Sequence, residues 1–467
     1  MSTEMPPQLR FAPRFLALAA LAFTAAFFVA PLWRNAVLAV AIAALVLAPL
    51  PRDSRGIVFA VMVGLATGIA SVNLFAVSIF QGPVTREFGW SQRSYALVLT
   101  IGTIVTVLSS VAIGHLFDRH GVRRFAIISI VLFALALMSL YFLTGNLWHF
   151  YAVFALVPII GAGTSSIAYS RVIARWFDKR RGQAFGAALA GIGIGGAVIS
   201  SLTQFLINEV GWRSAYVGLG ALSLVVTLPI VLWLLHDTPD ARGLAVDGEA
   251  APQTTQVTDP GRALIGFTAS QTLQQRRFWL MLAAFVALAF AIGGVMLQLV
   301  PILRARGITA NEAAATQGAL GLSLIVGRAF AGMLMDRLFA PHVAAAILLC
   351  PIVGVGLLAS GATGTSAQLG AVLLGLAAGA ELDVVAYLIT RYFGTRAYAT
   401  IYGWMYAGWT LGSGTAPYFT ALAFDRSGSH GAILWLYVAL FAISALMIAR
   451  LGRYPDLARP APLAATH

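Results

Sequence analysis

The chain has 467 residues, of which 59% are hydrophobic and 10% are charged. Soluble proteins carry about 25% charged residues, so this composition excludes an ordinary soluble enzyme and predicts a polytopic membrane protein. The net charge of +13 could indicate a nucleic-acid partner. In a membrane protein, however, basic residues gather in the cytoplasmic loops, so the positions of these charges decide between the two explanations. The single cysteine, Cys350, excludes a disulfide framework and a cysteine-based metal site.

The first fifty residues contain two apolar runs, separated by a short break at Pro31–Asn35. We expect an extra transmembrane hairpin over residues 1–51. A cleaved signal peptide is the alternative, since Arg10 and Arg14 would form its basic region. The second run follows closely, however, and no clean cleavage site of small residues stands out.

Twelve further apolar segments follow, each about 20 residues or longer, which is the length a helix needs to cross roughly 30 Å of hydrocarbon. Six lie in an N-terminal half (52–235) and six in a C-terminal half (278–453). A polar cytosolic linker (236–277) joins the halves, and a short tail (454–467) ends the chain. The predicted spans are approximately 57–80, 92–117, 123–144, 149–174, 183–207, 214–235, 278–301, 313–335, 343–361, 368–390, 397–422 and 431–449. The fold prediction is therefore all-α, with twelve core spans plus the hairpin, fourteen in total.

The basic residues support this topology. With the N-terminus in the cytoplasm, 22 of the 30 Lys and Arg residues fall on the cytoplasmic side, seven fall outside, and Arg328 alone lies within a span. Such a bias follows the positive-inside rule. It explains most of the net charge without a nucleic-acid partner and places both termini in the cytoplasm.

The two halves contain similar segments. Gly114–Arg119 aligns with Gly332–Arg337, and Arg171–Phe177 aligns with Tyr387–Phe393, at nearly the same offset along the chain. Internal repeats of this kind build the two halves of a transporter around a site near the middle of the membrane.

The segment Gly114–Arg124, GHLFDRHGVRR, resembles the G-x-L-x-D-R-x-G-R-R/K loop of the major facilitator superfamily. The resemblance implies a carrier that works by alternating access. A tight basic turn would let Asp118 hold a neighbouring helix N-terminus or an arginine, with Arg175 as its expected partner, and Arg391 would serve Asp336 in the same way. The alternative is that these residues only determine topology in solvated loops. The expected cytoplasmic gate comprises Gly114, Asp118, Arg119, Arg123, Arg175, Asp336, Arg337 and Arg391.

Within the superfamily, Trp176–Gly191 is similar to the signature that opens the fifth core helix of monocarboxylate transporters and the related oxalate:formate antiporters. Two departures qualify this resemblance. Animal members carry an aspartate four residues before the intramembrane arginine, where this chain has Leu324. The oxalate type carries a lysine in its eleventh core helix, but Ile401–Ala421 has none, which makes a doubly charged substrate less favoured.

Arg328 lies in the middle of an apolar segment, and a charge there needs a partner, a wet cavity or a ligand. We predict that it binds the substrate. Glu381 and Asp383 are the only two of the 17 acidic residues well inside a span, so they are its candidate counter-charges or proton carriers. Because they are two residues apart, they point to opposite sides of a helix, and at most one faces Arg328 squarely. The alternative is that both acids are structural.

Asn73, Tyr387 and Trp404 complete the predicted substrate site, although core or lipid-facing positions are the commoner explanation for any one aromatic residue. The glycines at Gly191–Gly196 satisfy a dinucleotide-binding pattern but lie within an apolar helix, so close helix packing explains them better. The histidines are scattered and show no metal-ligand spacing. We therefore predict neither a metal, a cofactor nor catalysis.

The sequence thus predicts a secondary transporter of a small organic anion, a monocarboxylate, in a bacterial inner membrane. Protons are a candidate second partner, symport and exchange both remain open, and the oligomeric state is not assigned. Efflux of amphipathic drugs is the first alternative, and Ile192 counts against it because drug–proton antiporters have proline there. The second alternative is a transporter-like sensor that binds a ligand without moving it.

Overall fold

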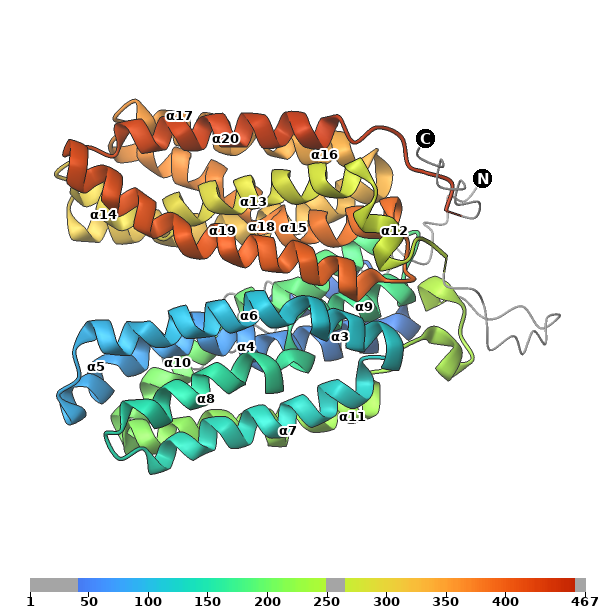
Figure 1. Cartoon of the computed structure of the whole chain (residues 1–467), viewed down its shortest axis with the longest axis horizontal. Coiled ribbons are helices and arrows are strands. Elements are labelled where there is room, and N and C mark those ends of the chain that lie inside the picture. The colour runs from blue at the N-terminus through green and yellow to red at the C-terminus, as the bar shows by residue number, and fades with distance from the viewer. Residues whose placement is uncertain (1–40, 249–264, 458–467) are drawn as a thin grey trace, which may run out of the picture. The chain divides into compact units, whose positions relative to one another are not determined.

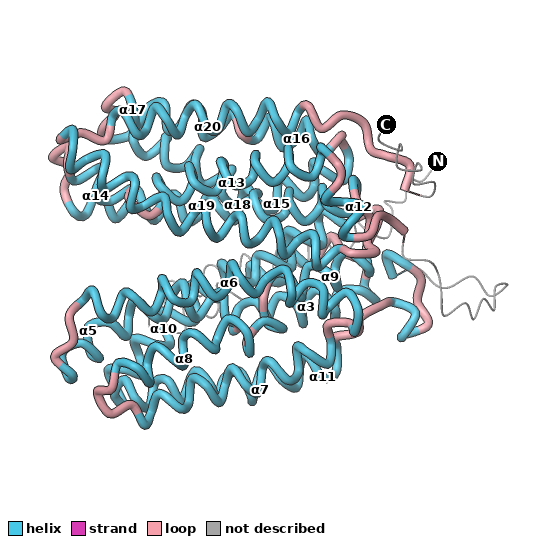
Figure 2. The backbone as a smooth tube through the Cα atoms, in the orientation of Figure 1, coloured by secondary structure: helices cyan, strands magenta, loops and turns pink. Residues whose placement is uncertain are grey.

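The computed structural model describes residues 41–248 and 265–457, and helices make up nearly all of this part of the chain (Figures 1 and 2). Each of the twelve predicted core ranges is helical for most of its length. The predicted N-terminal hairpin falls largely outside the described residues, although residues 41–47 are helical.

The chain forms two compact units. Unit 1 comprises residues 1–105 and 121–251, and unit 2 comprises residues 106–120 and 252–467. The boundary falls within helix α6 (Gln92–His120), so the end of this helix that carries the Gly114–Arg119 motif belongs to unit 2.

In unit 1, several helices are interrupted and continue after a short break. Together with the N-terminal part of α6, its elements are α3 (Arg52–Thr67), α4 (Ile69–Ser71), the π-helix η1 (Val72–Ala76), α5 (Val77–Phe88), α7 (Arg123–Ser139), the 3-10 helix η2 (Leu140–Phe142), α8 (Leu147–Ile160), the 3-10 helix η3 (Ala162–Thr164), α9 (Ser166–Trp176), α10 (Arg181–Leu222), the π-helix η4 (Ser223–Thr227), α11 (Leu228–Leu234), and the 3-10 helices η5 (Pro239–Arg242) and η6 (Val246–Gly248).

Besides the end of α6, unit 2 contains the helices that follow the linker. They are α12 (Ala269–Leu273), α13 (Arg276–Met296), α14 (Leu299–Arg304), α15 (Ala310–Arg337), α16 (Ala340–Ile347), α17 (Leu349–Ala359), α18 (Gly364–Tyr392), α19 (Tyr398–Ser427) and α20 (Gly431–Ala449). The start of α15 is set by Thr309, whose hydroxyl accepts a hydrogen bond from the N–H of Glu312 while the Glu312 side chain bonds back to Thr309. This reciprocal pair is a capping box, which satisfies N–H groups that the helix itself cannot.

Nine stretches of the described chain are long and apolar enough to cross a membrane. One of them, Arg181–Leu234, has 54 residues, well beyond the roughly 20 that a single crossing requires. Its backbone is non-helical at Gly211, where φ is 82°, a conformation that glycine adopts readily. The chain therefore turns between the predicted fifth and sixth core spans. The total of fourteen spans remains a prediction.

Aromatic side chains fill much of the core of unit 1. Phe80 stacks on Tyr216 with ring centroids 3.7 Å apart, and Trp212 packs edge-on against Tyr216. At the margin of this core, the Trp212 indole N–H donates to Glu87, and Arg213 forms an ion pair with the same carboxylate. These two contacts hold the pKa of Glu87 below its usual value.

Candidate substrate site

Small residues hold α18 against α15. A Cβ atom on Gly375 would overlap Ser323, and one on Gly379 would overlap the backbone of Leu324. Only glycine permits such a close approach of two helices. Gly375 and Gly379 lie four residues apart on one face of α18, and Asp383 continues this face by one more turn. The packing therefore directs Asp383 toward α15.

Arg328 meets α18 at this position. Its Nε lies 3.2 Å from Asp383 Oδ2 and donates a hydrogen bond of 2.9 Å to the carbonyl oxygen of Gly379. The Arg328 side chain is 14% exposed and that of Asp383 is fully buried. One of the two intramembrane acids is predicted to face Arg328. The structure shows that this acid is Asp383, which forms an ion pair with Arg328.

The hydrogen-bonding capacity of Asp383 is not used. Both carboxylate oxygens are buried, and neither has a hydrogen-bond partner with good geometry among the described residues. The pair with Arg328 is therefore a contact of charges without an aligned N–H···O bond. An ionised carboxylate that is buried without hydrogen bonds is costly, so this arrangement is suited to changing partners or binding a proton.

Glu381 lies in different surroundings from Asp383. It is 4% exposed and borders a crevice of about 10 Å³ lined by Phe285, Leu288 and Leu348 among others, which is near the lower limit for one water molecule. The Trp409 indole faces its carboxylate, yet neither Glu381 Oε1 nor Trp409 Nε1 has an aligned hydrogen bond within the described chain.

The aromatic residue that faces Glu381 is Trp409. Tyr402, Tyr406 and Trp409 form a stripe on α19, with successive ring centroids 6.3 and 5.6 Å apart. Trp404 is half-buried. At about 100° per residue it lies on the opposite side of the helix from this stripe. The contact of Trp404 with substrate remains a prediction.

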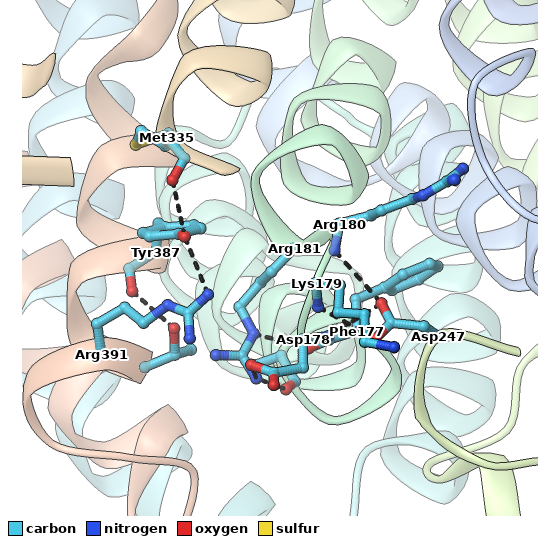
Figure 3. Close-up of polar contacts among 11 residues, drawn as sticks. Phe177, Asp178, Lys179, Arg180, Arg181, Asp247, Met335, Tyr387 and Arg391 are labelled. Carbon is cyan, nitrogen blue, oxygen red and sulfur yellow. Dashed lines mark hydrogen bonds and ion pairs between the residues drawn. The ribbon is translucent and has the colours of Figure 1, made fainter. Parts of the chain in front are cut away.

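Tyr387 is already engaged in contacts within unit 2. Its hydroxyl donates to the carbonyl oxygen of Met335 at 2.9 Å and accepts from Arg391 Nη2 at 3.1 Å, as Figure 3 shows. The Arg391 guanidinium also lies over the Tyr387 ring, 5.1 Å from its centroid. These contacts tie α18 to the end of α15, and Tyr387 as a substrate ligand remains a prediction.

Asn73 lies in unit 1, just beyond a break in the first core helix. Helix α3 ends at Thr67, Gly68 is extended, and Asn73 is half-buried in the π-helix η1. This break lies beside a second one, the short helix η3 between α8 and α9. A hydrogen bond joins the two, from the N–H of Ile69 to the hydroxyl of Thr164. Breaks and π-helical turns are frequent at functional sites, and Asn73 remains a predicted substrate ligand.

Asp118 holds a helix N-terminus, one of the two partners considered for it. Its carboxylate accepts hydrogen bonds from the N–H groups of Ala399 and Thr400 and from the Thr400 hydroxyl, at 2.7 to 3.0 Å. Gly114 lies one helical turn away, where a Cβ would overlap the carbonyl group of Ala399. The end of α6 and the start of α19 therefore form one junction. Pairing of Asp118 with Arg175 stays a prediction.

The other predicted gate residues have varied surroundings. The side chain of Arg123 donates to the carbonyl oxygen of Leu232 at 2.8 Å. Arg119 and Arg337 are exposed, whereas Asp336 and Arg391 are half-buried. A pair between Asp336 and Arg391 remains a prediction.

Two linker aspartates that the sequence analysis did not single out cap backbone N–H groups in unit 1. Asp237 accepts from the N–H of Val122 at 2.7 Å, at the start of α7. Asp247 is 6% exposed and accepts from three consecutive N–H groups just before α10, those of Asp178, Lys179 and Arg180 (Figure 3). Asp247 has φ of 66°, which no sequence pattern here predicts.

Comparison with known proteins agrees with this architecture. A family model described as Major Facilitator Superfamily matches residues 61–417. The chain is 25% identical to human monocarboxylate transporter 12 over 283 residues, which are 57% of this chain and 53% of the human protein. It is also 25% identical to mouse monocarboxylate transporter 11 over 399 residues, 82% of this chain and 84% of that protein. The match thus spans about half the length of the human relative.

Solved structures are similar in fold. The Escherichia coli fucose:proton symporter aligns with a TM-score of 0.62 and 16% identity, covering 85% of this chain and 98% of that one. The human organic anion transporter MFSD10 aligns with a TM-score of 0.63 and 16% identity, covering 85% and 100%. At this identity, the likeness concerns the fold alone. Among the described residues, no group of three or more His, Cys, Asp or Glu side chains is placed to hold a metal ion.

Proposed function

The chain belongs to the Major Facilitator Superfamily, and from this premise we propose that it carries a small organic anion, a monocarboxylate, across the membrane by alternating access. The observation that best supports the substrate class is Arg328, a mostly buried arginine within a membrane-spanning helix, paired with Asp383. The similarity to two monocarboxylate transporters points to the same class of substrate.

Arg328 would bind the substrate carboxylate. An arginine at the centre of a membrane costs at least about 2.5–3.5 kcal/mol, so it is retained there for a reason. A guanidinium also matches a carboxylate better than a point charge does, because it presents two parallel N–H donors. The bond from Nε to the carbonyl oxygen of Gly379 fixes the plane of the Arg328 guanidinium. The arriving carboxylate would then replace Asp383 as the counter-charge.

Asp383 is our proposed proton carrier in this exchange. While the site is empty, Arg328 balances its charge at 3.2 Å. Once a substrate carboxylate engages Arg328, Asp383 loses that balance in buried surroundings where no aligned hydrogen bond compensates it. Binding a proton removes the charge. Substrate and proton would then bind together, which corresponds to symport.

Glu381 is the second candidate for the proton. Its carboxylate borders an apolar crevice, and it forms no ion pair within the described chain. Because Glu381 lies about 200° around α18 from Asp383, a proton there would not compete with the substrate for Arg328. Protonation of Glu381 would instead act on the packing of α18 against its neighbours. The two acids thus predict different effects of mutation.

A binding screen tests the substrate class. The purified protein is heated with about a hundred carboxylates and with neutral amides of the same shapes, at two pH values, because a ligand stabilises the state that it binds. We expect one group of monocarboxylates to raise the melting temperature. Arg328→Lys should weaken that binding by about 3 kcal/mol, roughly a hundredfold. The exposed Arg426→Lys is the matched control. Equal stabilisation by acids and amides would argue against an anion site.

A further inference from the structure

A cavity of about 580 Å³ opens on unit 2 between α15, the α16–α17 pair and α18. Its walls are almost entirely apolar, and His342 is the one ionisable side chain other than Cys350 that lines it. The wall residues used below are Gly327, Phe330, Leu338, His342, Ala346 and Leu376. We call this cavity the α15–α16 groove. It lies on a different face of α15 from the Arg328–Asp383 pair.

The groove runs along the membrane-spanning helices. Gly327 lies ten residues before Arg337, the last residue of α15, so at 1.5 Å per residue the groove extends about 15 Å along the helix. This is about half of the roughly 30 Å thickness of a hydrocarbon core. One end of the groove therefore lies near the middle of the membrane, and the other lies at the loop between α15 and α16.

Large apolar side chains toward both ends of the groove face outward from the protein. Phe330 is 57% exposed and Leu338 is 59% exposed, and the neighbouring Val326 on α15 is 59% exposed. Large apolar side chains exposed on a membrane-spanning helix are covered by lipid chains. The groove is thus open to the bilayer along its length, and a hydrocarbon chain is the occupant that suits both its lining and its depth.

The loop end of the groove is polar and basic. His342 is exposed where it lines the groove, and Arg337 is exposed immediately before the lining residue Leu338. The positive-inside bias places this loop at the cytoplasmic surface. Basic residues there attract anionic lipid headgroups, and basic pockets between membrane helices bind them specifically.

We propose that the α15–α16 groove is a binding site for an anionic phospholipid of the cytoplasmic leaflet. One acyl chain lies in the groove beside Phe330 and Ala346, and the phosphate lies at Arg337 and His342. The groove ends on Gly327, where a Cβ would overlap the backbone of Leu376. This contact belongs to the α15–α18 packing that also places Arg328 beside Asp383. A bound lipid would therefore stabilise the helix pair that carries the proposed substrate site.

Binding can be measured without transport, so its outcome is independent of the proposed function. The purified full-length protein is titrated with phosphatidylglycerol or phosphatidylcholine of the same chain length, and melting temperature and bound lipid by native mass spectrometry are recorded. We expect phosphatidylglycerol to raise the melting temperature by several degrees and to remain bound, and phosphatidylcholine to do so weakly.

Two sets of variants localise the effect. Ala346→Trp fills the groove and should abolish the stabilisation, whereas Val353→Trp places the same ring on the exposed face of α17, outside the groove, and should preserve it. Arg337→Ala with His342→Ala leaves the groove open and should remove the preference for phosphatidylglycerol. If Ala346→Trp folds poorly, the double variant Arg337→Ala with His342→Ala still tests the site. Equal response to both lipids in the wild type, or an unchanged response in Ala346→Trp, would overturn the proposal.

Discussion

At the scale of single residues, two buried acids on one helix lie in different surroundings. Asp383 lies against Arg328 and Glu381 lies in an apolar crevice near Trp409. The sequence showed that the two acids point in opposite directions but not which one faces Arg328. The missing signal was the spacing of Gly375, Gly379 and Asp383, because two glycines at intervals of four mark the face of α18 that packs on another helix.

Asp383→Asn should separate substrate binding from proton coupling. The amide keeps the shape of the side chain but can neither balance the charge of Arg328 nor take up a proton. We expect monocarboxylate binding to persist, with exchange of internal for external substrate, while uptake driven by a pH gradient falls at least about tenfold. Counterflow and gradient-driven uptake in the same proteoliposomes measure the two activities. Normal gradient-driven uptake would remove Asp383 from the coupling step.

Glu381→Gln should have a different effect if Asp383 is the proton carrier. The glutamine stays neutral at every pH and leaves the Arg328–Asp383 pair in place. We expect gradient-driven uptake to be retained, with less than about a tenfold change in rate. Initial uptake rates across a series of external pH values provide the measurement. Loss of pH dependence in Glu381→Gln, together with its retention in Asp383→Asn, would transfer the role to Glu381.

At the scale of elements, the linker takes part in the structure of unit 1. Asp237 caps the start of α7, and Asp247 binds three N–H groups before α10. A carboxylate in these positions also complements the positive end of a helix dipole. From the sequence, residues 236–277 are predicted only as a polar connection, because caps between residues 67 to 115 positions apart leave no periodic pattern.

Substitutions of Asp247 should destabilise unit 1 in a defined order. Asn tolerates a positive φ and keeps one acceptor oxygen, whereas Ala loses the acceptors and is strained at φ of 66°. We expect Asp247→Ala to lose about 1–3 kcal/mol and Asp247→Asn less than half of that. Thermal unfolding in detergent compares them with the exposed control Asp240→Asn. Wild-type stability of Asp247→Ala would show that the three hydrogen bonds contribute little.

At the scale of the whole molecule, hydrophobic length and the internal repeat were the informative signals. The twelve predicted core segments are largely helical in the described chain, and the resemblance carried by Gly114–Arg124 is confirmed by the family match over residues 61–417. Breaks within spans were harder to predict. The extended residue at Gly68 occurs inside apolar sequence, where hydropathy does not change and glycine also serves close helix packing. The turn at Gly211, in contrast, falls between the predicted fifth and sixth spans.

The partner of Asp118 could be predicted only in part from sequence similarity. The motif around Gly114 indicated that Asp118 would hold an arginine or a helix end, and the structure shows the N-terminus of α19. The sequence could not choose between these partners, because Ala399 and Thr400 donate through backbone N–H groups. Backbone donors are present at every helix start and depend on tertiary packing for their position.

Uptake by proteoliposomes that contain Arg328→Lys tests the central claim most directly. The labelled substrate is the monocarboxylate that best stabilises the wild-type protein, and Arg426→Lys serves as the matched control in the same membranes. We predict that Arg328→Lys lowers uptake at least about a hundredfold at equal protein incorporation, because lysine cannot reproduce the paired donors of a guanidinium, while Arg426→Lys transports normally. Wild-type uptake by Arg328→Lys would contradict the assignment of Arg328 to the substrate.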